Sequence, residues 1–138
     1  MRVLLTGCAG FIGMHCALRL LARGDEVVGL DNLSPYYSVA LKQDRLRELQ
    51  AKRGFRFERL DLADAAALAP MFDTLRPEAV LHLAAQPGVR YSLENPASYI
   101  QSNLVAFANL LESCRRHPPR HLVYASSSSV YGANSKLP

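Results

Sequence analysis

The amino-acid sequence predicts an α/β fold in which one doubly wound parallel sheet carries helices on both faces. Short apolar runs alternate along the chain with longer amphipathic ones, as in consecutive β-α units. The first apolar run leads directly into a glycine-rich turn, and no segment is repeated or of low complexity. The chain of 138 residues, 49% hydrophobic and 20% charged, fits one globular domain, residues 1–138.

Five apolar runs are expected to form the strands, because each is short and bounded by turn residues. They are Arg2–Thr6, Glu26–Leu30, Phe55–Leu60, Ala79–Leu83 and His121–Ala125. Ligands of such sheets bind beyond the carboxyl ends of the strands, near the switch in strand order. The candidates for function are therefore the segments that follow the strands: Gly7–Gly13, Asp31–Asn32, Asp61–Leu62, Ala84–Tyr91 and Ser126–Gly132.

Helical periodicity predicts the connections between these strands. The expected helices are Phe11–Arg23, Val39–Arg53, Ala63–Leu75 and a longer one that begins at Asn95-Pro96, with Asn95 as N-cap. The first would have Ile12, Cys16, Leu20 and Leu21 on one side, and the second Leu41, Leu46 and Leu49 as its inner face. In the last, Ala97, Ile100, Leu104, Phe107, Leu111 and Cys114 recur at helical steps.

Composition excludes several classes of function. The formal charge of +4 gathers most densely at Arg115–His121, where cations complement a helix C-terminus, and no nucleic-acid recognition motif accompanies it. No apolar run is long enough to span a membrane, and the opening MRVLLTG is not a signal peptide, so a cytoplasmic protein is expected. The three cysteines show no CxxC spacing and the four histidines no metal-ligand cluster.

The turn TGCAGFIG, Thr6–Gly13, follows a strand and opens a helix, which is the context of a dinucleotide fingerprint. Gly7 would permit the tight turn, Gly10 the close approach of a pyrophosphate, and Gly13 the packing of the helix near the sheet. The helix N-terminus would then face the negative charge. A simple tight β-α turn is the alternative, and the position at the first strand favours a Rossmann-type site.

Two acidic residues end the next strands. Asp31 is placed to bond the adenosine ribose hydroxyls, and its charge favours NAD because it would repel the 2′-phosphate of NADP. The alternative is an ordinary strand-end or N-cap acid. Asp61 could reach the adenine or instead cap the helix that starts near Ala63.

Five segments together resemble the extended short-chain dehydrogenases/reductases that act on nucleotide sugars. They are TGxxGFIG, Asp31-Asn32, HLAAQPGVRYSLENP (82–96), SNLVAFANLLE (102–112) and YASSSSVYG (124–132). GLDNLSPYYSVALK (29–42) and QPGVRYSLENP are most similar to UDP-glucuronate 4-epimerases. The resemblance covers essentially the whole chain.

The resemblance implies an NAD-binding domain, a smaller C-terminal substrate domain, a UDP-sugar substrate and a homodimer of the full-length protein. In such enzymes a tyrosine removes the proton of the sugar 4-OH while hydride passes from C4 to NAD⁺ and later returns to the other face. The implied cofactor residues are Gly7, Gly10, Phe11, Ile12, Gly13, Asp31, Asn32, Asp61, Leu62, Ala84 and Ala85. Ser127 would be catalytic, bonding the sugar O4 or the phenol, and Arg90, Ser127 and Ser128 would contact substrate.

The family's catalytic base comes as Tyr-x-x-x-Lys, which this sequence lacks. Its six tyrosines are followed four positions later by Ala40, Leu41, Asn95, Asn103, Ser128 and Ser135. Tyr131 has Lys136 five positions on, which does not align two side chains on a helix. We therefore expect an incomplete amino-terminal portion, ending after about the fifth strand, with that strand at an exposed edge and a tendency to self-associate.

The sequence thus predicts the NAD-binding part of a nucleotide-sugar 4-epimerase that interconverts UDP-glucuronate and UDP-galacturonate, with this chain alone inactive. Another reaction of the same family, by a decarboxylase, dehydratase or reductase, is the first alternative. The 4,6-dehydratases would show Thr-Asp-Glu before VYG, where this chain has Ser127–Ser129. A catalytically inactive dinucleotide-binding module is the second, because Tyr-x-x-x-Lys is absent.

Overall fold

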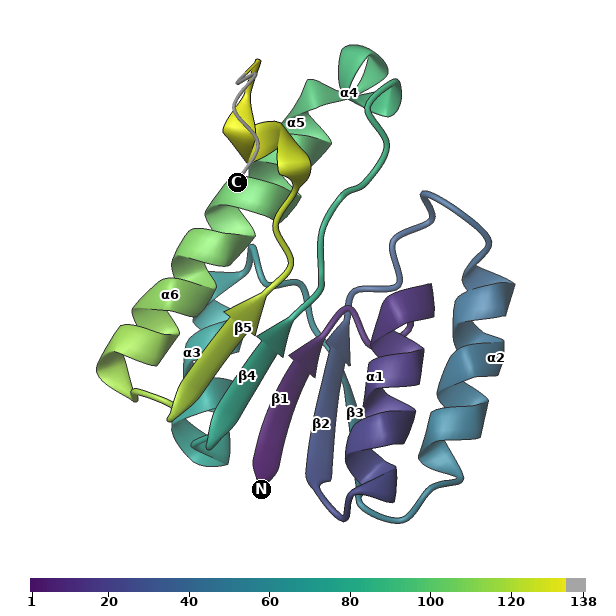
Figure 1. Cartoon of the computed structure of the whole chain (residues 1–138), viewed down its shortest axis with the longest axis vertical. Helices are drawn as coiled ribbons and strands as arrows, with labels where there is room; N and C mark the ends of the chain where they lie inside the picture. Colours follow the sequence, from purple (N-terminus) through teal and green to yellow (C-terminus); the bar gives the residue numbers. More distant parts are fainter. Residues whose placement is uncertain (134–138) are drawn as a thin grey trace.

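The computed structural model describes residues 1–133 and contains one parallel sheet of five strands (Figure 1). The strands are β1 (Arg2–Thr6), β2 (Glu26–Asp31), β3 (Phe55–Arg59), β4 (Ala79–His82) and β5 (His121–Tyr124). Their order is β3-β2-β1-β4-β5, so the strand order reverses between β1 and β4. The predicted fold class is confirmed, and each predicted strand lies within one residue of its observed bounds.

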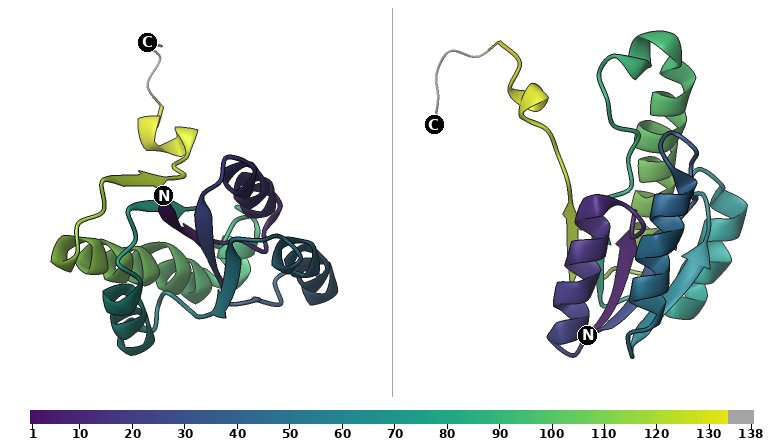
Figure 2. Two further views of the ribbon diagram at one scale, coloured as in Figure 1. Left: turned by 90° about the horizontal axis from the view of Figure 1, so that it is seen from below. Right: turned by 90° about the vertical axis from the view of Figure 1, so that its right-hand side faces the viewer.

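Helices cover both faces of the sheet, as Figure 2 shows in the view from below. Helices α1 (Phe11–Ala22) and α2 (Val39–Gln50) lie on one face, and α3 (Ala65–Leu75) and α6 (Ala106–Arg116) lie on the other. The remaining described elements are short helices: α4 (Tyr91–Glu94), α5 (Pro96–Tyr99), the π-helix η1 (Ile100–Val105) and the 3₁₀ helix η2 (Ser128–Tyr131). The sheet therefore separates two hydrophobic layers.

Each layer has its own core of buried side chains. Leu4, Val80, Phe72 and Leu110 belong to the core between the sheet and α3 and α6. Leu5, Val27, Ala17 and Leu49 belong to the one between the sheet and α1 and α2. Successive residues of β1 thus alternate between the two cores, as the period of a strand requires. The runs are apolar throughout because both faces are covered.

The fourth predicted helix begins where expected but is not uniform. Asn95 is the N-cap of α5, its side chain accepting a hydrogen bond from Ser98 N at 3.3 Å, and Pro96 follows at the first helical position. The chain then passes through η1 before continuing as α6. Residues 96–116 therefore form one helical segment with a π-helical stretch inside it, a feature often found at functional sites.

Several residues of the predicted apolar helix patterns are exposed, and one of them, Leu41, corrects an expected inner face. On α1, Ile12 faces solvent while the small Gly13 and Ala17 are buried, because this helix lies very close to the sheet. On α2, Leu46 and Leu49 are buried as predicted, but Lys42 is buried in place of Leu41. Along residues 96–116, the exposed large apolar side chains are Ile100, Leu104 and Leu111.

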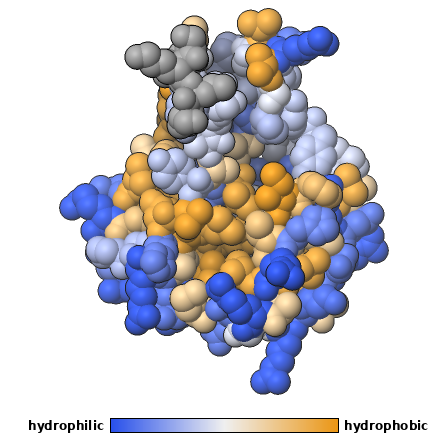
Figure 3. Space-filling view, viewed as in Figure 1, coloured by the Kyte–Doolittle hydropathy of each residue, from blue (hydrophilic) through white to orange (hydrophobic). Residues whose placement is uncertain are grey.

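One part of the sheet lacks a covering helix on the α1 side. Val123 of β5 pairs in register with Leu81 of β4, whose side chain packs in the α1-side core, so both point to the same face. Val123 is nevertheless 57% exposed. Figure 3 shows the apolar area that this leaves on the face seen in Figure 1, to the left of α1. Of the described strands, β5 forms the edge of the sheet beside this area.

Candidate functional site

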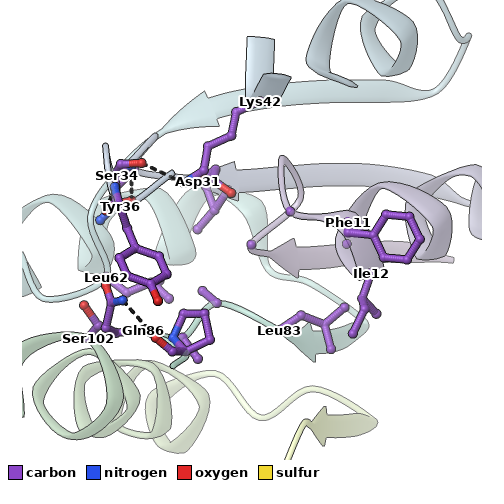
Figure 4. A pocket seen from close by; sticks show the side chains of 18 of the residues that line it. Phe11, Ile12, Asp31, Ser34, Tyr36, Lys42, Leu62, Leu83, Gln86 and Ser102 are labelled. Carbon is purple, nitrogen blue, oxygen red and sulfur yellow. Dashed lines mark hydrogen bonds between the residues drawn. The ribbon is translucent and has the colours of Figure 1, made fainter. Parts of the chain in front are cut away.

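A cavity of about 530 Å³ lies beyond the carboxyl ends of the strands, at the switch between β1 and β4. All of the predicted cofactor residues line it: Gly7, Gly10, Phe11, Ile12, Gly13, Asp31, Asn32, Asp61, Leu62, Ala84 and Ala85. Figure 4 shows Phe11 and Ile12 at one end, Tyr36 and Gln86 at the other, and Asp31 between them. The fold therefore brings together residues from four separate turns.

The glycine turn approaches its neighbours too closely for side chains. Gly7 has φ +71°, and a Cβ there would lie 2.8 Å from Ala84 N in the turn after β4. A Cβ on Gly13 would lie 2.0 Å from Gly7 O. No side chain caps the N-terminus of α1, whose first backbone N–H groups have no partner within the helix. This turn thus presents a positive helix end to the cavity, where an anionic group would be stabilised.

Asp31 is buried at the end of β2 and binds backbone on two sides. Its Oδ2 accepts a hydrogen bond from Ala9 N at 3.1 Å, and its Oδ1 accepts one from Leu33 N at 2.9 Å. The carboxylate therefore holds the glycine turn against the loop after β2, a role the sequence did not reveal. Each oxygen has a second lone pair, so ribose hydroxyls can still donate to Asp31.

Asn32 and Asp61 connect the ends of β2 and β3. Asn32 Nδ2 donates to Asp61 Oδ2 at 3.0 Å, and Asp61 Oδ1 accepts from Ala63 N at 2.9 Å. The helix expected to start near Ala63 begins at Ala65, and its N-cap is Asp64. Asp61 therefore does not cap α3, and it remains free to line the cavity.

Two cations on α2 line the cavity and were not predicted. Lys42 is buried, its Nζ donates to Ser34 O at 2.9 Å and lies 4.5 Å from the Tyr37 ring centroid. Arg45 Nη1 donates to Ala9 O at 3.2 Å and to the Tyr37 hydroxyl at 3.1 Å. In the sequence, the one sign that Lys42 and Arg45 face inward is their helical spacing from Leu46 and Leu49. Their contacts with the cavity are seen only in the folded helix.

Asn103 holds the loop that follows β4. Its Oδ1 accepts from Gln86 N at 2.8 Å and its Nδ2 donates to Gln86 O at 3.1 Å, so one amide engages both backbone groups of a single residue. Asn103 lies within η1, and both residues are partly shielded from solvent. The π-helix thus positions the Asn103 side-chain amide against Gln86, which lines the cavity together with Pro87.

The predicted substrate residues lie apart from this cavity. Ser127 is exposed, its hydroxyl accepts from Ser129 N at 3.2 Å and it is the N-cap of η2. Ser128 begins η2, and Arg90 is exposed in the turn before α4. Of the serine segment's neighbours, Ala125 reaches the cavity lining. Ser127 does not line the cavity, and its role in catalysis stays a prediction; Lys136 lies outside the described residues.

Thiol and metal chemistry find little support in the described part of the chain. Cys8, Cys16 and Cys114 are free, and burial raises the pKa of the Cys114 thiol to about 11. Burial, assisted by the charge of Asp31, also raises the pKa of Cys8 well above its usual range. Within residues 1–133, no group of three His, Cys, Asp or Glu side chains could hold a metal ion. None of the described helices is both long and apolar enough to cross a membrane.

Several known proteins are similar in sequence to this chain. A probable UDP-glucuronate 4-epimerase of Rhizobium meliloti (strain 1021) is 51% identical over 138 residues, 100% of this chain and 40% of that protein. UDP-glucuronate 4-epimerase 1 of Arabidopsis thaliana is 53% identical over 137 residues, 99% of this chain and 32% of that protein.

Among solved structures, the UDP-glucuronic acid 4-epimerase of Bacillus cereus, in complex with UDP-glucuronic acid and NAD, superposes with a TM-score of 0.85 at 34% identity. That match covers 99% of this chain and 43% of the other. The chain thus spans well under half the length of these relatives. Residues 3–138 match the NAD dependent epimerase/dehydratase family, so the chain belongs to that family.

Proposed function

We propose that this chain is the NAD-binding portion of a nucleotide-sugar 4-epimerase that interconverts UDP-glucuronate and UDP-galacturonate. The single observation that carries the proposal is the cavity at the β1–β4 switch, which collects every predicted cofactor residue in one place. The relatives that are about half identical to the chain support the choice of sugar.

The residues present fit a dinucleotide. The uncapped N-terminus of α1 and the side-chain-free Gly7 and Gly13 form a cradle for a pyrophosphate. Asp31 would accept hydrogen bonds from the ribose hydroxyls, and Asn32 and Asp61 line the part of the cavity where we expect the adenine. A nicotinamide dinucleotide held there supplies hydride transfer at the sugar C4.

The buried carboxylate of Asp31 supports NAD over NADP, because a 2′-phosphate would meet its negative charge. Replacing Asp31 with Asn removes that charge and keeps one acceptor oxygen. We expect NAD to bind at least about tenfold more tightly than NADP to the wild-type chain, which corresponds to about 1.4 kcal/mol. Asp31→Asn should narrow this ratio, and calorimetric titrations with both dinucleotides measure it.

Ser127 is proposed to bond the sugar O4 or the catalytic phenol, and Arg90 and Ser128 to contact the UDP-sugar. The 3₁₀ helix places these serine hydroxyls just past the carboxyl end of β5, at the same edge of the sheet as the cavity. Ser127 can both donate and accept a hydrogen bond there. Arg90, exposed beside the loop after β4, offers a charge for a carboxylate or phosphate.

The test of function is incubation of the chain with NAD and UDP-glucuronate, followed by separation of the two 4-epimers. We expect NAD binding without turnover, because the 138 residues contain no Tyr-x-x-x-Lys. Turnover that survives Tyr131→Phe would contradict our account of the missing base. Absence of NAD binding would contradict the proposal itself.

Two alternatives keep specific support. The missing Tyr-x-x-x-Lys pair favours an inactive dinucleotide-binding module. The same assay on a longer chain that carries the pair distinguishes the two hypotheses, because turnover of that longer chain would exclude an inactive module. Another reaction of the family, by a decarboxylase, dehydratase or reductase, would yield a product other than the 4-epimer.

We also infer a homodimer of the full-length protein, and a cytoplasmic location, which the free thiols support. Ile100, Leu104 and Leu111 expose large apolar side chains along one helical segment, and such surfaces mark protein contacts. Replacing Leu104 with Lys should shift a dimer towards monomer in analytical ultracentrifugation. An unchanged sedimentation coefficient of a dimeric protein would exclude this surface.

A further inference from the structure

A buried threonine hydroxyl joins the two strands at which the sheet reverses its order. Thr6 of β1 and His82 of β4 are register partners, and Thr6 Oγ1 lies 2.7 Å from His82 Nδ1. The same oxygen accepts hydrogen bonds from Leu83 N and Ala84 N, each at 3.1 Å. One hydroxyl thus contacts the last side chain of β4 and two backbone N–H groups of the turn after it.

The direction of these bonds fixes the protonation of His82. A hydroxyl has two lone pairs and one proton. Ala84 N–H donates to Thr6 Oγ1, and Leu83 N–H divides its bond between Thr6 Oγ1 and Thr6 O, the latter at 3.2 Å. With two N–H groups on the oxygen, the hydroxyl proton is the group left for His82, so we assign Nδ1 as the acceptor and the imidazole as the neutral Nε2–H tautomer. Burial, which lowers the pKa of His82, acts in the same direction.

The imidazole is also held from the other side. Its ring stacks on Phe107 of α6, with centroids 5.2 Å apart and planes 10° from parallel, and Phe107 in turn contacts the Tyr124 ring at 5.2 Å. Thr6 and His82 are both buried. The stacking on Phe107 therefore holds the imidazole ring in position, and the Thr6 hydroxyl sets its tautomer.

This network reaches the cavity through Ala84. Ala84 N, which donates to Thr6, is the atom that lies 2.8 Å from the Cβ position of Gly7. The hydrogen bond from Ala84 N to the Thr6 hydroxyl therefore sets the distance between the glycine turn and the turn after β4. We propose that His82 and Thr6 are positioning residues, which hold these two turns at the separation that a dinucleotide requires. The inference rests on the proposed NAD site.

The experiment compares paired variants of the whole chain by NAD titration. His82→Phe keeps a ring over Phe107 but removes the acceptor, and Thr6→Val removes the hydroxyl at constant shape. We expect each to weaken NAD binding about tenfold, a change of about 1.4 kcal/mol, and the double variant to be little worse than either. His82→Asn, whose amide oxygen can replace Nδ1, and Thr6→Ser should each stay within about threefold of wild type.

A control variant separates positioning from loss of stability. Leu68→Ala removes a buried side chain of α3, on the face of the sheet opposite to α1, and destabilises the core beside His82 without touching the cavity lining. If Leu68→Ala weakens NAD binding as much as His82→Phe at temperatures where both are folded, or if the single losses simply add, the proposal is overturned. Rescue by His82→Asn together with an unaffected Leu68→Ala supports it.

A spectroscopic measurement keeps this inference separate from the proposed function. Nitrogen-15 NMR of the imidazole should show an unprotonated Nδ1 in the wild-type chain and a mixture of tautomers in Thr6→Val. A protonated Nδ1 in the wild-type chain would overturn the inference even if NAD binds. Absence of NAD binding by a chain that shows the expected tautomer would instead contradict the proposed function.

Discussion

The two halves of the sheet differ in how completely helices cover their strands; β1 and β2 represent the first half and β5 represents the second. In β1 and β2, all residues but the first of each strand are buried, and α1 and α2 cover them on one face. In β5, three of the four residues are exposed, and no described helix covers its α1 side. The cavity lies where the two halves meet, at the switch between β1 and β4, whereas Ser127 and Ser128 follow β5.

This difference shows that the turns around the cavity and the serine segment are held by separate sets of contacts. The turns that line the cavity are tied together by Asp31 to Ala9 and Leu33, and by Thr6 to Leu83 and Ala84. The serine segment is held by bonds among its own residues, Ser127 to Ser129. We therefore expect the turns around the cavity to bind a dinucleotide without rearrangement.

The largest expected effect is in the glycine turn. A Cβ at Gly13 would collide with Gly7 O, so Gly13→Ala must displace the turn or α1. We expect a loss of about 3 kcal/mol in the free energy of unfolding, as for severe overpacking, with NAD binding abolished. Denaturant unfolding and NAD titration measure the two effects.

Gly132→Ala is the matched change in the other half. Gly132 has φ +61° and ψ −141°, with no atom within 4 Å of its Cβ position, so only backbone strain of about 1–3 kcal/mol opposes the change, confined to an exposed turn. NAD affinity should be unchanged. Equal losses of NAD binding in the two variants would remove the distinction between the halves.

Paired valines give the next largest difference. Val27 of β2 is 0% exposed and Val123 of β5 is 57% exposed, although both are strand residues on the α1 side of the sheet. Val27→Ala should cost about 2 kcal/mol of stability, since it opens a cavity in a closed core. Val123→Ala should stay within about 0.5 kcal/mol. Similar losses would mean that β5 is covered in solution, for example by a second copy of the chain.

The smallest predicted effect is a dependence on pH through His82. Its pKa in the folded chain lies below the ordinary value of 6.5 because of burial, so the unfolded chain takes up a proton first on acidification. The contribution to stability is present above pH 6.5 and is lost as the pH falls from there towards the folded pKa. His82→Asn should flatten this part of the profile of unfolding temperature against pH. A parallel profile would assign the dependence to other groups.

The sequence predicted the strands and the cofactor turns because each rests on a local rule. Apolar runs between turn residues mark buried parallel strands, and the glycine spacing of Gly7, Gly10 and Gly13 follows from backbone contacts within one turn. The structure collected all of these residues in one cavity. Their binding to NAD stays a prediction until it is measured.

Other features depend on packing that no local pattern contains. Ile12, Leu41 and Leu104 are apolar and helically spaced, yet they are exposed, because periodicity does not tell a core from a surface that awaits a partner. Lys42 is buried because its aliphatic stem packs inward while its Nζ finds Ser34 O and the Tyr37 ring. The π-helix that carries Asn103 and the direction of the Thr6 hydroxyl appear only once the strands are assembled.

The most direct test of the central claim is an NMR titration of the chain with NAD, following every backbone amide. We predict saturable shifts at Gly7, Gly10, Gly13, Asp31 and Ala84, and little change along β5 from His121 to Tyr124. Such a result would place the dinucleotide in the cavity at the β1–β4 switch. Absence of saturable shifts, or shifts centred on the serine segment alone, would contradict the account.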